Sequence, residues 1–317
     1  MRPRLLALTL ICGLGHPAEG ADVARRPARL NVMTSDSLFA AVNRNDATAA
    51  MRVWVNQVGR RKGFQFHSTV TVFQDVDVAI SGLGQKSVDL LVLDTPDYLR
   101  LAETGLVVPI AAGANLRFKL GFEYVLLVRE GTAGTFGDLR EKRVATSSRT
   151  KARLGLAWIE TLLADQRLGP ASQFFSSVVD APQSSACVLP VFFGRLDACV
   201  VDSGNLELLQ ELNPQLAKLK IVARSPALVE GVVAMPGVPH PYREELIEAI
   251  LDLHKDPTGA HLVTLFRTGP LVRVTDATFD TVRVIWNRYR KLRPEAGRGS
   301  VPGTSARGLE PEERTPR

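Results

Sequence analysis

Small hydroxyl-bearing and acidic residues gather at four places in this chain, and each place directly follows a short apolar run. The four clusters are Thr34-Ser35-Asp36-Ser37, Asp94-Thr95, Thr146-Ser147-Ser148-Arg149-Thr150 and Asp202-Ser203. Hydroxyls and carboxylates can form several hydrogen bonds to a small polar ligand. Open α/β sheets bind their ligands just beyond the carboxyl ends of the strands. Four polar strand ends therefore predict a binding site at one edge of such a sheet.

The third cluster also carries cationic side chains and precedes a predicted helix. Arg149, Lys151 and Arg153 surround the start of that helix, where unpaired backbone N–H groups already favour an anion. Arginine can bind phosphate, sulfonate or carboxylate through two parallel hydrogen bonds. The alternative is plain N-capping by Ser148 or Thr150, which needs no ligand. Both interpretations stay open for any single residue, and the coincidence of four strand ends favours ligand contact.

Patterns that would indicate catalysis are missing from the sequence. It has no glycine-rich phosphate loop with its lysine and no Gly-x-Ser-x-Gly nucleophile motif. The histidines show no usable metal-ligand spacing, and no pair of carboxylates is visibly placed for acid–base work. We therefore expect a binding protein rather than an enzyme, with no cofactor and no bound metal.

Alternating strands and helices would position the four clusters. In the first block, strands are predicted at 30–34, 66–73 and 88–93, with helices at 47–61, 76–83 and 96–103. In the second, strands are predicted at 122–129, 144–148, 174–179, 197–202 and 219–223, with helices at 138–142, 149–165, 184–193 and 205–213. A returning segment at 229–235 and helices at 241–254, 258–267 and 279–289 follow. This order predicts an α/β fold with mostly parallel sheets covered on both faces.

Both ends of the chain differ from the middle. Two arginines, a ten-residue apolar run and a small-residue site predict a cleaved export signal over 1–20. A buried N-terminal helix, or lipidation at Cys12, is the alternative. Residues 294–317 are rich in Gly, Pro, Arg and Glu without apolar periodicity, which predicts a disordered tail.

The composition of the 317 residues is ordinary for a soluble globular protein, with 45% hydrophobic and 23% charged residues. The net charge is +6, but the basic residues are scattered, which disfavours nucleic acid as a partner. Two cysteines remain after the predicted signal, Cys187 and Cys199. They could form a disulfide in an oxidising compartment, and buried free thiols are the alternative.

Five stretches of the chain carry a family resemblance. They are 88–94 with 96–99, 122–129, 137–145, 194–199 and 256–259. In this order and spacing they resemble the periplasmic substrate-binding proteins of the phosphonate/phosphite uptake family. The resemblance implies a type II periplasmic-binding-protein fold, in which two α/β lobes are joined by two crossover strands and hold the ligand between them. Lobe 1 would comprise 28–122 and 230–293, and lobe 2 would comprise 123–229.

The resemblance also implies a site for a small oxyanion such as phosphonate, phosphite or phosphate. In the family, a Ser-Thr-Ser-Gly-like loop at a helix start in the second lobe holds the anion. The matching stretch here, 147–152, lacks the glycine and has two additional cations, and 183–185 replaces a histidine-containing stretch. The expected ligand contacts are Thr34, Ser35, Ser37, Asp94, Thr95, Tyr124, Ser147, Ser148, Arg149, Thr150, Lys151, Ser184 and Asp202.

The implied mechanism is hinge closure around the anion, followed by docking of a monomeric periplasmic protein on an ABC permease. An alternative partner is the exterior domain of a membrane signalling kinase, to which the same fold could present a ligand. An enzyme such as a pyrimidine-precursor synthase of the thiamine pathway is disfavoured by the export signal and by the lack of a histidine-rich site. Ferric iron is disfavoured because the four tyrosines include no adjacent pair.

Overall fold

The computed structural model describes residues 26–39, 42–61, 64–115, 119–147, 153–266 and 268–294. The expected signal segment and all but the first residue of the expected tail lie outside the described residues. So do Ser148, Arg149, Thr150 and Lys151, which carry much of the predicted anion site. None of the described helices combines the length and apolar character needed to cross a bilayer.

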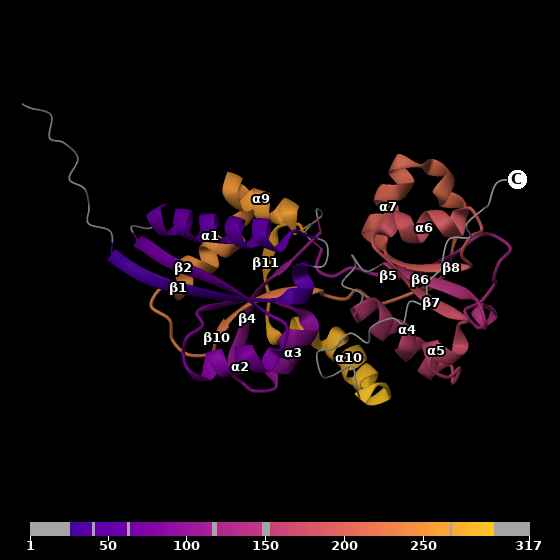
Figure 1. Cartoon of the computed structure of the whole chain (residues 1–317), viewed down its shortest axis with the longest axis horizontal. Helices are drawn as coiled ribbons and strands as arrows, with labels where there is room; N and C mark the ends of the chain where they lie inside the picture. Colours follow the sequence, from indigo (N-terminus) through magenta and orange to yellow (C-terminus); the bar gives the residue numbers. More distant parts are fainter. Residues whose placement is uncertain are drawn as a thin grey trace, which may run out of the picture.

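A six-stranded sheet organises one of the two lobes, which we call lobe 1 (Figure 1). Its strands are β1 Arg26–Ser35, β2 Phe64–Phe73, β3 Leu90–Asp94, β4 Val107–Gly113, β10 Gly231–Pro236 and β11 Leu271–Arg273, in the order β11-β4-β10-β3-β1-β2. β1 pairs with β2 and β3 in parallel, whereas β10 and β11 run antiparallel to their neighbours. The central strand β3 is almost continuously apolar because helices cover both of its faces.

The helices of lobe 1 form two layers. They are α1 Arg44–Arg61, α2 Val76–Gly84, α3 Thr95–Ala102, α8 Arg243–Leu251, α9 Pro257–Leu265 and α10 Asp280–Leu292, with 3-10 turns at Asp36–Phe39, Leu253–Lys255 and Asp276–Phe279. α1, α8 and α9 share one hydrophobic cluster with one face of the sheet. α2 and α3 cover the opposite face (Figure 1).

A five-stranded sheet organises lobe 2. Its strands are β5 Tyr124–Val128, β6 Arg143–Ser147, β7 Ser177–Ala181, β8 Ala198–Asp202 and β9 Lys220–Arg224, in the order β7-β6-β8-β5-β9. The helices are α4 Arg153–Asp165, α5 Ala171–Phe174, α6 Ser184–Phe192 and α7 Ser203–Leu212, with 3-10 turns at Gly137–Leu139 and Pro214–Lys218. α6 and α7 cover one face of this sheet and α4 and α5 cover the other (Figure 1). The two sheets with their helices confirm the predicted α/β class.

Two chain segments connect the lobes and are hydrogen-bonded to each other. The first precedes β5 and the second precedes β10. The N–H of Phe122 donates to the carbonyl of Leu228 at 2.9 Å, and the N–H of Leu228 donates to the carbonyl of Phe122 at 3.0 Å. We call residues 119–123 and 226–230 the hinge segments.

The structure differs from the sequence-based elements at several places. β4 and β11 were not predicted, because Pro109 and a run of small residues hide β4 and because β11 has only three residues. The strand predicted at 174–179 is wrong at its start, since α5 ends at Phe174 and β7 begins at Ser177. Phe174 and Phe175 instead pack around Phe136, with ring centroids 5.7 and 6.4 Å away. The predicted helices at 138–142 and 241–254 shorten to a 3-10 turn and to α8 followed by a separate turn.

Cys187 and Cys199 form a disulfide, which decides between the two alternatives that the sequence left open. The bond joins α6 to β8, with the two Cα atoms 5.7 Å apart. Both cysteines are fully buried within the hydrophobic cluster on the α6 and α7 side of lobe 2.

Candidate functional site

Strand register brings the polar strand ends of both lobes to the hinge. In lobe 1, Asp94 at the end of β3 pairs with Gly231, the first residue after the second hinge segment. In lobe 2, Asp202 at the end of β8 pairs with Tyr124, the first residue after the first hinge segment. The carboxyl ends that the sequence marked as polar therefore converge on the connection between the lobes.

The residues of lobe 1 form a hydrogen-bonded cluster around Asp94. The hydroxyl of Ser37 donates to one carboxylate oxygen of Asp94 at 2.6 Å, and the N–H of Asp97 donates to the other at 2.8 Å. The N–H of Asp94 donates to the hydroxyl of Ser35 at 3.3 Å. Asp94 thus caps the start of α3, as short acidic side chains commonly do.

Thr95 and Thr34 have contrasting roles beside this cluster. The hydroxyl of Thr95 donates to the carbonyl of Val229 at 2.6 Å, and its N–H donates to the carbonyl of Glu230 at 3.0 Å. Thr95 therefore fastens α3 to the second hinge segment. Thr34 is fully buried in β1, and its hydroxyl has no hydrogen-bond partner among the described residues. An unpaired buried hydroxyl is costly, so a ligand or a water molecule could satisfy this group beside the Asp94 cluster.

In lobe 2, Asp202 repeats the capping role of Asp94. Its carboxylate accepts from the N–H of Asn205 at 2.8 Å and from the side-chain amide of the same residue at 2.6 Å. Burial raises the pKa of Asp202, and the hydrogen bonds from Asn205 only partly oppose that effect. The buried carboxyl closes the start of α7 in the way that Asp94 closes the start of α3.

The start of α6 differs from those of α3 and α7. Its N-cap residue, Gln183, makes no side-chain capping hydrogen bond, and the first residue, Ser184, is buried. α6 follows β7, whose last residue, Ala181, pairs with Ser147 at the end of β6. The start of α6 therefore follows the strand end beside the one that leads into residues 148–152, which lie outside the described residues.

Tyr124 and Glu230 join the two hinge segments. The hydroxyl of Tyr124 donates to the carboxylate of Glu230. Burial, and then the neighbouring carboxylate, raise the pKa of Tyr124 far above its ordinary value. The N–H of Tyr124 donates to the hydroxyl of Ser225 at 2.8 Å. Tyr124 is among the ligand contacts expected from the sequence, whereas Glu230 is not.

The structure thus gathers Ser35, Ser37, Asp94 and Thr95 on one side of the hinge and Tyr124 and Asp202 on the other. Ser184 lies at the start of α6, and Ser147 ends β6. The described part of this region is rich in carboxylates, and the expected cations Arg149 and Lys151 lie outside the described residues.

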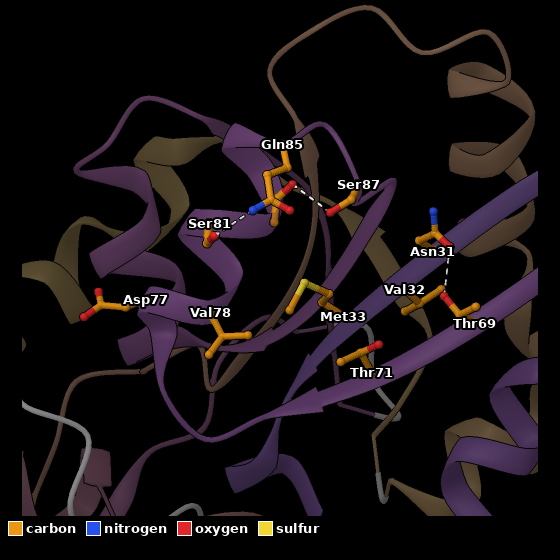
Figure 2. Close-up of a pocket in the computed structure, with 11 residues that line it drawn as sticks. Asn31, Val32, Met33, Thr69, Thr71, Asp77, Val78, Ser81, Gln85 and Ser87 are labelled. Atoms are coloured by element: carbon orange, nitrogen blue, oxygen red, sulfur yellow. Dashed lines mark hydrogen bonds between the residues drawn. The ribbon is translucent and has the colours of Figure 1, made fainter.

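A separate pocket of about 630 Å³ lies on lobe 1, between α2 and the strands β1 and β2. Figure 2 shows Ser81 and Gln85 on the helix side, facing Asn31, Thr69 and Thr71 on the strands. Gln85 donates to Ser81 at 3.2 Å, and Thr69 donates to Asn31 at 2.8 Å, so these polar groups satisfy one another. None of the expected ligand residues that the structure describes lines this pocket, and it is not the candidate site.

Solved structures place this architecture in a known class. The fold resembles XAC2383 from Xanthomonas citri bound to chloride ion, with a TM-score of 0.61, 14% identity, and coverage of 84% of this chain and 99% of that one. It also resembles PhnD1 from Prochlorococcus marinus in complex with methylphosphonate (TM-score 0.56, 15% identity, 83% and 98% coverage). A third relative is a binding protein component of an ABC phosphonate transporter from Pseudomonas aeruginosa (TM-score 0.56, 11% identity, 84% and 88% coverage). These similarities establish the fold, that of a type II periplasmic binding protein.

The family follows from a sequence comparison. The family model for the phosphonate periplasmic substrate-binding protein of ABC transporters matches residues 37–279, and the chain belongs to this family. Members of this family are not enzymes but substrate-binding components that work with ABC permeases. Membership implies a periplasmic location. Among curated protein sequences, none matches the chain.

Proposed function

We propose that this protein, after removal of the export signal at 1–20, captures a small oxyanion of the phosphonate, phosphite or phosphate type. Hinge closure would hold the anion between the lobes, and the closed monomer would deliver it to its permease. The observation that carries this proposal is the family match, which runs through both lobes and both hinge segments. The hydrogen-bonded hinge and the polar strand ends beside it support the mechanism.

The capping pattern supports a particular place for the anion. The starts of α3 and α7 are occupied by the carboxylates of Asp94 and Asp202, which would repel a second anion. At the start of α6, the N-cap residue Gln183 makes no side-chain capping hydrogen bond. The neighbouring strand end leads into 147–151, where Arg149 and Lys151 supply positive charge. We therefore assign the anion to the starts of α4 and α6 in lobe 2, with the unpaired hydroxyl of Thr34 as a candidate partner from lobe 1.

Titration calorimetry with protein unfolded, dialysed and refolded to strip endogenous ligand tests the proposal. The ligands are phosphate, phosphite, methylphosphonate, ethylphosphonate and methanesulfonate, at one pH and one salt concentration. We expect saturable binding heat with at least one phosphorus oxyanion and weaker or no heat with the sulfonate. Refolded protein that has its native circular dichroism but binds none of the four phosphorus oxyanions would contradict the assigned ligand class. Light scattering during size exclusion checks the monomer.

A further inference from the structure

Helix α10 begins in lobe 1 and ends on lobe 2. It follows β11 and the turn Asp276–Phe279, and it packs along α4 more extensively than along α3 (Figure 1). Its first half is fastened to lobe 1. Arg283 donates to Asp276 at 2.7 Å, and the hydroxyl of Tyr98 in α3 donates to the same carboxylate at 2.6 Å. Farther along, Arg290 pairs with Glu103 just beyond α3, at 2.5 Å.

The end of α10 is fastened to lobe 2 by two ion pairs. Arg288 pairs with Asp165 at the end of α4. Arg293, directly after α10, pairs with Glu160 in the middle of α4 at 2.8 Å. The Glu160 side chain is only 4% exposed, and its second oxygen accepts from the N–H of Ala171 at 3.1 Å. A buried carboxylate needs its cation, and here the cation comes from the other lobe.

Apolar packing joins the lobes at the same place. The buried side chains of Val282, Trp286 and Tyr289 recur on one face of α10. They belong to one hydrophobic cluster that also contains Tyr98 of α3 and Trp158 of α4. The core of lobe 1 therefore continues into the core of lobe 2 through α10.

We propose that α10 is an interlobe strap that holds the lobes together on the side of α2, α3, α4 and α5, so that the lobes open on the side of α1 and α7. Among the described residues, the hinge segments carry no helix across the side of α1 and α7 beyond the paired Phe122 and Leu228. With the strap fastened, lobe 2 rotates about the line that joins the hinge to the contact between α10 and α4. This inference concerns the motion and does not depend on which ligand is bound.

The test measures the distance between the lobes in ligand-free protein by pulsed electron resonance. Spin labels are placed at Val53→Cys in α1 and Leu208→Cys in α7, two exposed positions in helices that lie on the side opposite α10 (Figure 1). In the strap variant, Arg288, Arg293 and Glu160 are all replaced by Gln, which removes both ion pairs without leaving a buried charge. We expect the distance distribution to become at least twofold wider.

The matched control is Arg283→Gln in the same helix. Its ion-pair partners, Asp276 and Asp280, belong to the same segment of lobe 1, so the width of the distribution should not change. A strap variant that is folded by circular dichroism and keeps the original width would overturn the proposal.

Hydrogen exchange on the unmutated protein keeps the proposal testable if the strap variant does not fold. A strap that forms one cooperative unit with α4 predicts equal opening free energies for the slowest amides of both helices. Amides of α10 that exchange more than tenfold faster than those of α4 would show that the helix detaches on its own, and the proposal would then be wrong.

Discussion

Asp94 and Asp202 show how one residue type performs the same task in both lobes. Each ends a buried strand, and each carboxylate accepts from the N–H three residues later in the chain. The sequence marked both as ligand contacts. In the structure, all four of their carboxylate oxygens accept hydrogen bonds from within the protein, which supports our proposal that the anion binds near residues 147–151 instead.

This assignment makes Arg149 and Lys151 the residues to neutralise. We expect Arg149→Gln combined with Lys151→Gln to weaken binding of the best oxyanion by about tenfold or more, the scale of one charge-assisted hydrogen bond. The control combines Lys218→Gln and Lys255→Gln, which removes the same net charge at two exposed positions outside the candidate site. Calorimetry that shows equal affinity for both double variants would place the anion elsewhere.

Burial of Asp202 has a consequence for stability. Because burial raises its pKa, the folded protein keeps this proton at pH values where the unfolded chain releases it. Its contribution to stability is therefore lost as pH rises from about 4, the ordinary value for Asp, through the raised pKa. We expect the free energy of unfolding of Asp202→Asn, relative to the unmutated protein, to rise across this window. Urea unfolding at several pH values between 3 and 7 measures it.

Asp138 provides a comparison, because its pKa is shifted in the opposite direction to that of Asp202. Its exposed carboxylate accepts from the N–H groups of Thr135 and Gly134, and these bonds lower its pKa. Its contribution is present above pH of about 4 and is lost as pH falls through the lowered pKa. Asp138→Asn should therefore lose stability relative to the unmutated protein as pH rises from 3. The prediction is wrong if the stability difference between each variant and the unmutated protein does not change with pH. The pKa of each carboxyl would then be the same in the folded and unfolded chains.

At the scale of elements, the disulfide fixes α6 against β8 in lobe 2. It closes a short loop, with a sequence separation of 12. Chain-entropy arguments give such a loop about 3 kcal/mol. We expect Cys187→Ala combined with Cys199→Ala to lower the free energy of unfolding by this amount, as measured by urea unfolding. The unmutated protein under reductant should match the double variant, and the double variant should not respond to reductant. An unchanged midpoint in the double variant would show that packing alone holds α6.

The elements that the sequence predicted best are those with buried, continuous apolar runs, such as β3 and β8. Their pattern follows directly from helices on both faces. β4 escaped prediction because Pro109 lies within it and small residues follow, features more typical of a turn. The sequence identifies Cys187 and Cys199 as possible disulfide partners but does not show whether they are bonded, because spacing along the chain does not fix distance in space. Glu230 was missed because its role depends on Tyr124, more than a hundred residues away.

For the whole molecule, the sequence predicts the α/β alternation and, through the family resemblance, two crossover segments, but it does not predict the contact of α10 with lobe 2. α10 shows an apolar stripe that indicates only a helix with one buried face. Nothing in the sequence pairs Arg293 with Glu160, since the two are 133 positions apart. Tertiary partners of this kind depend on how the two lobes are arranged, which local patterns do not encode.

A substitution at Gly121 in the first hinge segment tests how closely the two hinge segments must approach. Gly121 has φ of +82°, and an added Cβ would lie 3.2 Å from the backbone nitrogen of Leu228. Gly121→Ala should therefore cost about 1–2 kcal/mol from the left-handed backbone, and additionally weaken the hydrogen bonds between Phe122 and Leu228. Gly131→Ala is the matched control, since Gly131 has φ of +81° and no atom within 4 Å of the added Cβ. Urea unfolding compares the two costs, and amide exchange reports on the hinge bonds. Because only Gly121→Ala crowds the hinge, its Phe122 and Leu228 amides should exchange faster than in the control, and equal exchange would mean that the hinge tolerates the extra carbon.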